Sequence, residues 1–174
     1  IGLTEAGTIT SGTVKSSYVL GTLLHENIGN TIRVSLTTDP VNEIYVAKEI
    51  LKMTGKYNSP TIISCPTCGR TEYNMLEIIE KIEPLINKIN HPLKIAIMGC
   101  VVNGPGEAKD ADLGIAGGKH QVVLFKKGQI VRKIKEENII DELKKEILDK
   151  FGSVLEEEFI FAESGFHAFI FKYN

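Results

Sequence analysis

The chain has 174 residues, of which 43% are hydrophobic and 24% are charged, and these are the proportions of an ordinary globular protein. Twenty basic and 22 acidic residues leave a formal charge of -2, which gives no electrostatic sign of a nucleic-acid partner. Because no apolar run approaches the roughly 20 residues that span a bilayer, and no signal peptide is recognisable, we expect no membrane partner. The odd count of 3 cysteines argues against a disulfide scaffold and favours a reducing compartment, the cytoplasm.

The first 55 residues predict two strand–helix units in succession. A short strand over residues 1–3 precedes a helix over 14–26, and residues 31–37 alternate between apolar and polar side chains, which is typical of a strand. Asp39 is a suitable cap for a second helix, which we expect from Pro40 to Gly55. Strands that alternate with helices indicate a parallel sheet or barrel.

The apolar side chains of these two helices recur at helical spacing and predict the faces that reach the core. In the first helix they are Val14, Val19, Leu20, Leu23 and Leu24. In the second they are Val41, Ile44, Ala47, Ile50 and Leu51.

After a polar, proline-containing boundary near residues 56–60, a second group of elements follows. We expect strands over 61–64, 93–98 and 112–116 and a hairpin of 121–125 with 129–133. Apolar spacing predicts helices over 72–90 and 136–150, the first bent or divided at Pro84.

The end of the chain differs in composition from the rest. Six of the seven phenylalanines lie in residues 151–174, where Phe159 and Phe161 alternate on one side of a Glu-Ser-Gly turn and Phe169 and Phe171 on the other. This aromatic tail predicts a hairpin that adds to a sheet, and we see no chemistry in it.

The cysteines carry the strongest chemical signal. Cys65 and Cys68 are two residues apart in a predicted turn, and Cys100 follows a later predicted strand. All three lie where a strand passes into a loop, so they can meet at one edge of a sheet and hold one metal centre. Because three thiolates leave a tetrahedral centre one ligand short, Glu107 in the glycine-rich loop after Cys100 is a candidate oxygen ligand.

Spacing alone leaves other interpretations open. A structural zinc site would need His91 or His120 as a further ligand. A redox pair of Cys65 and Cys68, or three plain buried cysteines, are further alternatives. On these grounds an iron–sulfur centre is only slightly favoured over zinc.

Five motifs in this order resemble one family, the hydroxymethylbutenyl diphosphate synthases of the non-mevalonate isoprenoid pathway. They are TEAG (4–7), IRVSL (32–36), CPTCGR (65–70), GCVVNGPGE (99–107) and ADLGIAGG (111–118). The resemblance covers residues 1 to about 150, and the aromatic tail lies outside it.

The resemblance implies an α/β fold with three parts. Residues 1–57 would be the last strand–helix units of a TIM-type barrel, 58–150 a small α/β domain with a [4Fe–4S] cluster, and 151–174 a tail of unknown role. The cluster ligands would be Cys65, Cys68, Cys100 and Glu107. The reaction would be the reductive ring opening and dehydration of 2-C-methyl-D-erythritol 2,4-cyclodiphosphate, with electrons from flavodoxin or ferredoxin, in a homodimer.

The resemblance also suggests roles for single residues. A carboxylate such as Glu107 is a more exchangeable iron ligand than a thiolate, so substrate can take its place, and Asn103 in the same loop would hydrogen-bond the substrate. On the strand over 31–37, Arg33 and Ser35 would point inward and bind the diphosphate. Glu5, after the first strand, would contact substrate or handle a proton.

Two strand–helix units cannot close an eight-stranded barrel. Since the chain also begins at Ile1 instead of Met, we expect a fragment or a processed chain that holds a cluster but does not turn over substrate alone. The alternative functions are an electron-transfer iron–sulfur module and a zinc-stabilised interaction domain.

Overall fold

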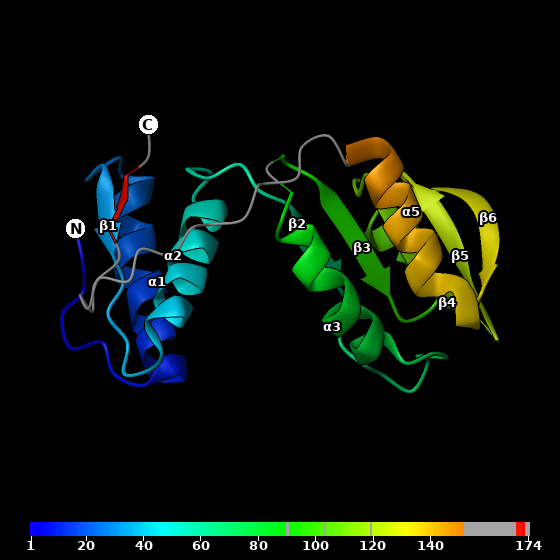
Figure 1. The fold of residues 1–174 in the computed structure, drawn as a ribbon, viewed down its shortest axis with the longest axis horizontal. Coiled ribbons are helices and arrows are strands. Elements are labelled where there is room, and N and C mark those ends of the chain that lie inside the picture. Colours follow the sequence, from blue (N-terminus) through cyan, green and yellow to red (C-terminus); the bar gives the residue numbers. More distant parts are fainter. Residues whose placement is uncertain (90, 103, 119, 152–169, 173–174) are drawn as a thin grey trace. The chain divides into compact units, whose positions relative to one another are not determined.

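The computed structural model describes residues 1–89, 91–102, 104–118, 120–151 and 170–172 (Figure 1). The chain divides into two compact units, each considered by itself. The first unit is Ile1–Asn58 with Ile160–Asn174, and the second is Ser59–Phe159. Within the described residues, no helix has the length and apolar character needed to cross a membrane.

The first unit packs two helices against one short strand. Helix α1 (Ile9–His25) precedes strand β1 (Thr31–Arg33), and helix α2 (Pro40–Met53) follows it. One core joins the three elements through buried side chains: Leu20, Leu24, Ile32, Val34, Ala47, Ile50 and Leu51. The apolar side chains of residues 32–34 therefore pack against the two helices.

The start of α2 confirms the predicted cap. The Asp39 carboxylate accepts a hydrogen bond of 2.9 Å from the Val41 amide, and Pro40 occupies the first helical position. An amide of the first turn has no partner within the helix, so the Asp39 side chain satisfies a donor that would otherwise remain unpaired.

Four details of the first unit correct the predictions from the sequence. Residues 1–3 form only one isolated bridge, between Gly2 and Arg33, because a turn at Thr4 and Glu5 follows at once. The strand predicted over 31–37 ends at Arg33, and one isolated bridge at Thr37 is all that follows. Helix α1 begins five residues earlier than predicted and leaves Val14 exposed.

The core face of α2 is confirmed in part. Ala47, Ile50 and Leu51 are buried as predicted, whereas Val41 and Ile44 are half-buried and Glu43, only 4% exposed, occupies a core position. Glu43 turns inward because its carboxylate accepts a hydrogen bond from the backbone amide of Leu36.

The aromatic tail contributes strand β7 (Ile170–Lys172) to the first unit. It pairs antiparallel with β1, with Phe171 opposite Ile32. This pairing confirms that the tail adds to a sheet. The predicted partner strand around Phe159 and Phe161, and Phe169 beside β7, lie outside the described residues.

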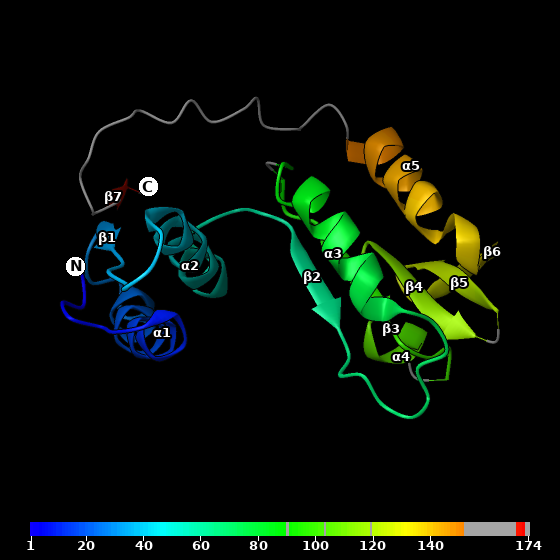
Figure 2. The ribbon, with the colours of Figure 1, turned by 60° about the horizontal axis from the view of Figure 1, so that its bottom comes forward.

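The second unit is built on one five-stranded mixed sheet (Figures 1 and 2). Its strands are β2 (Thr61–Ser64), β3 (Lys94–Met98), β4 (Leu113–Gly118), β5 (Gln121–Lys126) and β6 (Gln129–Lys135), adjacent in that order. β2, β3 and β4 are mutually parallel, whereas β5 and β6 form the predicted antiparallel hairpin. Parallel strands place their carboxyl ends at one edge, so the loops after β2 and β3 emerge together.

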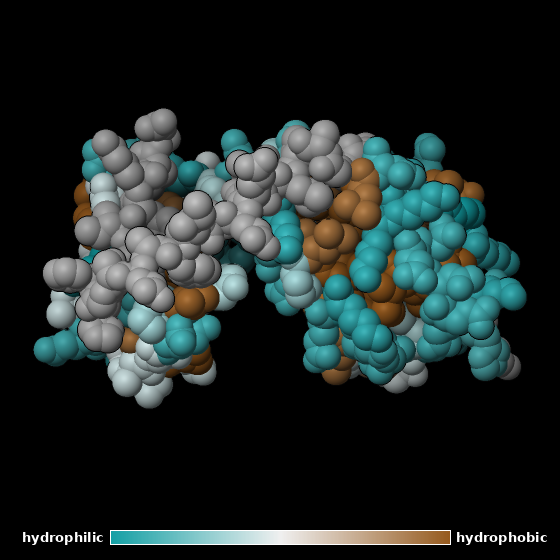
Figure 3. Space-filling view, in the orientation of Figure 1, coloured by the Kyte–Doolittle hydropathy of each residue, from teal (hydrophilic) through white to brown (hydrophobic). Residues whose placement is uncertain are grey.

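Helices cover both faces of this sheet (Figure 2). On one face α3 (Met75–Ile86) and α5 (Ile139–Phe151) bury the larger core, and on the other the short helix α4 (Gly104–Glu107) and the turn after it cover Ala96, Met98 and Ala116. Hydrophobic surface is visible between the positions of α3 and α5 (Figure 3). Leu76 on α3 and Leu148 on α5 are exposed hydrophobic side chains.

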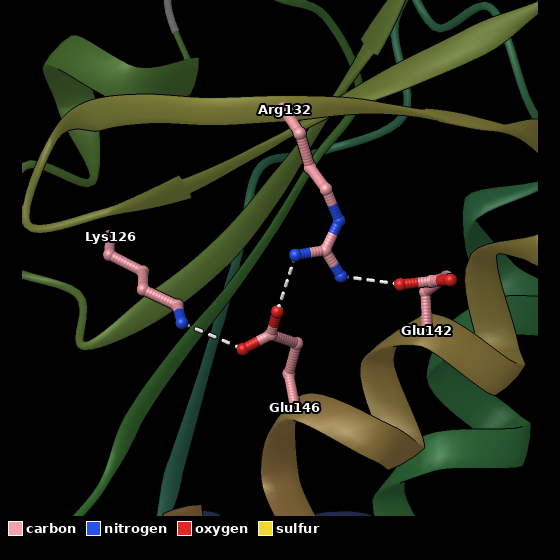
Figure 4. A network of polar contacts seen from close by, with 4 residues as sticks. All are labelled: Lys126, Arg132, Glu142 and Glu146. Atoms are coloured by element: carbon pink, nitrogen blue, oxygen red, sulfur yellow. Dashed lines mark hydrogen bonds and ion pairs between the residues drawn. The ribbon is translucent and has the colours of Figure 1, made fainter. Parts of the chain in front are cut away.

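Ion pairs fasten α5 to the hairpin (Figure 4). The Glu146 carboxylate accepts one hydrogen bond from Lys126 and one from Arg132, both 2.7 Å long. Arg132 also donates to Glu142, one turn earlier on α5. The hydrogen bond from Lys126, and then that from Arg132, hold the pKa of Glu146 below its ordinary value.

Three predicted elements of the second unit needed correction. The helix predicted over 72–90 spans only Met75–Ile86, because the Asn74 side chain accepts a hydrogen bond from the Glu77 amide and caps it. Pro84 lies within its last turn and does not divide it. The loop after Cys100 contains helix α4, which the sequence did not indicate, and the last predicted helix starts with a 3-10 turn over Glu136–Asn138.

Candidate functional site

Two of the cysteines emerge at the same edge of the sheet. Ser64, the last residue of β2, lies opposite Ile97 of β3, so Cys65 and the Gly99–Cys100 turn leave the sheet side by side. The Gly99 amide donates a hydrogen bond of 3.1 Å to the Cys65 sulfur. The register of β2 and β3 therefore brings one cysteine sulfur onto the backbone next to another cysteine.

The third cysteine lies in a tight turn stabilised by Thr71. The Thr71 amide donates to the Cys68 carbonyl at 3.0 Å, and the Thr71 hydroxyl accepts from the Cys68 amide at 3.3 Å. Cys68 itself is exposed. Hydrogen bonds from the Arg70 backbone and side chain hold the pKa of the Cys68 thiol below its ordinary value, which favours the thiolate that binds metals.

Glycines permit the close packing of these loops. A Cβ atom at Gly117 would lie 2.3 Å from the Gly99 carbonyl oxygen and 2.7 Å from the Tyr73 ring. A Cβ atom at Gly99 would lie 2.6 Å from the Thr71 hydroxyl. Because real side chains do not approach so closely, both positions need glycine for steric reasons.

Tyr73 supports the same loop from the core. Its hydroxyl donates a hydrogen bond of 3.1 Å to the carbonyl of Met98, the residue before Gly99, and its side chain is buried. Burial, and then the nearby Cys65, raise the pKa of Tyr73 well above its ordinary value. The phenol therefore remains protonated and serves as a permanent donor.

Glu107 is the last residue of helix α4, in the loop that follows Cys100. Gly104 is buried against the sheet, where a Cβ atom would lie 2.6 Å from that of Ala116, and Glu107 is exposed at the end of the helix. Asn103, for which we expect a substrate contact, lies outside the described residues.

No group of three or more histidine, cysteine or acidic side chains within the described ranges is arranged to hold a single metal ion. The structure brings the Cys65 sulfur beside the Cys100 turn but does not gather these side chains around one point. Cys65, Cys68, Cys100 and Glu107 stay the candidate ligands of an iron–sulfur cluster, whose ligands are spread over several iron atoms.

The first unit brings two of the other candidate residues to one place. Arg33 lies over Gly2, and its Nη2 atom donates a hydrogen bond of 2.9 Å to the Thr4 hydroxyl, next to Glu5. The Arg33 Nε atom is buried without a hydrogen-bond partner. Glu5 is exposed in the turn with φ +59°, not at the end of a strand as predicted.

Ser35 is half-buried in the segment that follows β1, and a buried carboxylate fixes that segment. The amide of Leu36 donates to Glu43 Oε1 at 2.7 Å, while Glu43 Oε2 is buried without a hydrogen-bond partner. This contact explains why α2 turns Glu43 toward the core.

Sequence reasoning missed Thr71, Tyr73, Gly117 and Glu43 as supports of these sites. Signals for two of them were present: Thr71 follows Cys68 at the spacing of a tight turn, and Gly117 starts a glycine pair at the end of a predicted strand. For Tyr73 and Glu43 the apolar pattern contained no such signal, because their partners are backbone groups outside their own helix or turn, the Met98 carbonyl and the Leu36 amide.

Comparison with known families gives two matches along the chain. The family model described as the GcpE protein C-terminal domain matches residues 61–149, and the one described as the GcpE TIM-barrel domain matches residues 1–48. The two matches follow the division between the two units.

Several relatives share one description, 4-hydroxy-3-methylbut-2-en-1-yl diphosphate synthase (flavodoxin). That of Ruminiclostridium cellulolyticum is 60% identical over 148 residues, which are 84% of this chain and 42% of that protein. That of Clostridium acetobutylicum is 58% identical with the same coverage of both chains. That of Lysinibacillus sphaericus is 54% identical over 159 residues, 91% of this chain and 43% of that protein. The chain thus spans less than half the length of these curated relatives.

Proposed function

Because this chain belongs to the GcpE protein family, we propose that it forms part of an enzyme that reduces 2-C-methyl-D-erythritol 2,4-cyclodiphosphate to 4-hydroxy-3-methylbut-2-enyl diphosphate. In this proposal residues 58–150 hold a [4Fe–4S] cluster through Cys65, Cys68, Cys100 and Glu107. Residues 1–57 contribute strand–helix units of a TIM-type barrel, and the role of residues 151–174 beyond the β7 pairing is open.

One observation carries the proposal: the Gly99 amide donates to the Cys65 sulfur at the edge where Cys100 also emerges. Backbone N–H donors to cysteine sulfur are a feature of protein iron–sulfur centres, where they stabilise the charge on the sulfur atoms. The lowered pKa of Cys68 supports the same interpretation, since the thiolate is the form that binds iron. The chemistry of the donor set therefore fits the cluster.

The reaction takes up two electrons and one proton, breaks the bond between a ring carbon and a diphosphate oxygen so that the diphosphate gains one negative charge, and releases a hydroxyl group as water. A bound cluster would supply the electrons and Lewis acidity for this conversion. Arg33 and Ser35 would bind the diphosphate through charge-assisted hydrogen bonds, and Asn103 would hydrogen-bond the substrate. Glu5, in the turn beside the Arg33–Thr4 contact, would contact substrate or carry a proton.

We further propose flavodoxin or ferredoxin as the electron donor, a homodimer as the working assembly, and the cytoplasm as the location. The relatives' description specifies flavodoxin for those proteins. The low-potential electrons that such donors supply suit a cluster-dependent reduction.

Anaerobic reconstitution with iron and sulfide tests the proposal. We expect about four iron and four sulfide per chain, as a cubane requires. One zinc without sulfide would refute the cluster and would instead identify a zinc-stabilised interaction domain. A cluster whose assembly and electron transfer do not depend on Glu107, the exchangeable ligand, would indicate an electron-transfer module.

Glu107→Ala separates the ligand proposal from a general fold requirement. We expect this variant to hold less iron and to change the electron paramagnetic resonance spectrum of the reduced protein. Glu83→Ala, at an exposed position on α3, serves as the matched control and should leave both unchanged. Equal iron content and spectra in the Glu107 variant would remove Glu107 from the ligand set.

A further inference from the structure

We infer that Thr71 and Tyr73 are positioning residues for the metal centre: together they hold the Gly99 amide on the Cys65 sulfur and thereby raise the reduction potential of the centre and slow its loss of iron. The inference rests on the proposed function, because it concerns the cluster assigned to Cys65. Thr71 and Tyr73 themselves would bind neither the metal centre nor the substrate.

The Cys65 sulfur accepts a hydrogen bond from the Gly99 backbone amide. The Gly99 amide lies 3.1 Å from the Cys65 sulfur, within hydrogen-bonding distance for that pair of atoms. Reduction adds negative charge that is partly carried by the cysteine sulfurs, so an N–H donor stabilises the reduced state more than the oxidised state. Loss of this donor should therefore lower the reduction potential.

Gly99 lies in a confined space. Thr71 contacts Gly99 on one side, and Gly117 approaches the Gly99 carbonyl on the other. The amide of Val101 donates to the Gly117 carbonyl at 2.6 Å, which fastens the Cys100 turn to the end of β4. Gly99 is thus confined between two loops and cannot turn its amide away from Cys65 unless one of them moves.

Thr71 couples the two cysteine loops. Its hydroxyl accepts from the Cys68 amide, and the same oxygen would lie 2.6 Å from a Cβ atom at Gly99. One side chain therefore fixes the Cys65–Cys68 turn and lies beside the Cys100 turn. Its removal should loosen both turns relative to each other.

Tyr73 holds the residue before Gly99 from the core side. Its hydroxyl donates to the Met98 carbonyl directly before Gly99, and its ring lies where a side chain at Gly117 would stand. Because the hydroxyl is buried, its hydrogen bond is not replaced by water when the loop shifts. Tyr73 therefore fixes the direction of the Met98–Gly99 peptide from the core side.

The apoprotein allows a test that needs no cluster. Tyr73→Phe and Thr71→Val each remove one hydrogen-bonding oxygen and keep the shape of the side chain. In each variant we expect the Gly99 amide to exchange with deuterium about fivefold faster, the effect of losing one hydrogen bond of ordinary strength. Tyr45→Phe and Thr61→Val, both at exposed positions, are the controls and should leave the rate unchanged. Equal Gly99 exchange in wild type and variants would overturn the inference.

The loaded protein provides two further readouts. We expect both variants to show a more negative midpoint potential, followed by electron paramagnetic resonance, and about fivefold faster release of iron to a chelator. Circular dichroism establishes that each variant is folded before it is compared. A Gly117→Ala variant should change both quantities in the same direction through steric displacement of Gly99.

The outcomes separate the inference from the proposed function. If wild type takes up no iron and sulfide, the proposed cofactor fails, and the inference fails with it. If wild type loads but all variants match it in potential and iron release, only the inference is overturned and the cluster stands.

Discussion

Glu146 offers a sharp test of how α5 is held on the sheet. Glu146→Gln keeps the shape of the side chain but removes its charge. The oxygen of the new amide can still accept a hydrogen bond. Its NH2 group is a donor and faces either Lys126 or Arg132, which are donors too. One of the two 2.7 Å hydrogen bonds is therefore lost.

The magnitude follows from the exposure of the partners. The Glu146 side chain is only 16% exposed, whereas Lys126 and Arg132 are 39% and 41% exposed, so water screens the cations but hardly reaches the carboxylate. Hydrogen bonds to charged groups contribute about 1.5–3 kcal/mol when buried and exposed ion pairs about 0–1 kcal/mol, and we expect a loss of about 1–2 kcal/mol between these limits. For a unit of this size the melting temperature should fall by about 5–10 °C.

Urea unfolding followed by far-ultraviolet circular dichroism at several pH values measures this loss. The pKa of Glu146 is lowered in the folded state, so its contribution is complete above the ordinary carboxyl pKa of about 4.3 and is lost as the pH falls through the lower, folded value. The difference between wild type and Glu146→Gln should therefore stay constant from neutral pH to about pH 5 and shrink below about pH 4.

Glu80→Gln, at an exposed position on α3, is the control and should change stability by no more than about 0.5 kcal/mol. A Glu146→Gln protein as stable as wild type at neutral pH would refute the role of the ion pairs. A difference that persists unchanged at low pH would show that the lost stability does not come from the carboxylate charge.

Three further predictions concern other parts of the molecule. Arg70→Gln keeps the backbone hydrogen bond to Cys68 but removes the guanidinium, so it should raise the pKa of Cys68 in part and slow the alkylation of the apoprotein at neutral pH, as followed by mass spectrometry; an unchanged rate would contradict the contribution of the Arg70 side chain. Gly114→Ala should lower the free energy of unfolding by more than about 2 kcal/mol, because the new Cβ atom would lie 2.3 Å from the buried Phe125 ring. Asp39→Ala should cost about 1 kcal/mol in urea unfolding through loss of its helix cap, and no change would show that Pro40 alone starts the helix.

Elements specified by adjacent residues were predictable. Asp39 and Pro40 start α2, and the alternating residues around Lys127–Gly128 form the β5–β6 hairpin, because caps and tight turns depend on side chains only a few positions apart. The second unit's strands β2 and β3 were also close to their predicted bounds, since continuous apolar runs bounded by turn residues indicate buried strands.

Elements whose bounds depend on partners elsewhere in the chain were not predictable. The strand over 31–37 ends at Arg33, and the segment 1–3 makes a single bridge, because a strand extends only as far as its neighbour pairs with it. Glu43 interrupts an otherwise apolar face for a similar reason: its partner is the backbone amide of Leu36, on the other side of a loop.

The sequence by itself determined the chemical content of this protein: three cysteines and Glu107 in two loops, each placed after a predicted strand. Only the tertiary structure decided how those loops meet. The parallel register of β2, β3 and β4 places the Gly99 amide on the Cys65 sulfur and confines it between Thr71 and Gly117. A hydrogen bond depends on distance and direction between groups far apart in the chain, and sheet register sets both, whereas residue spacing sets neither.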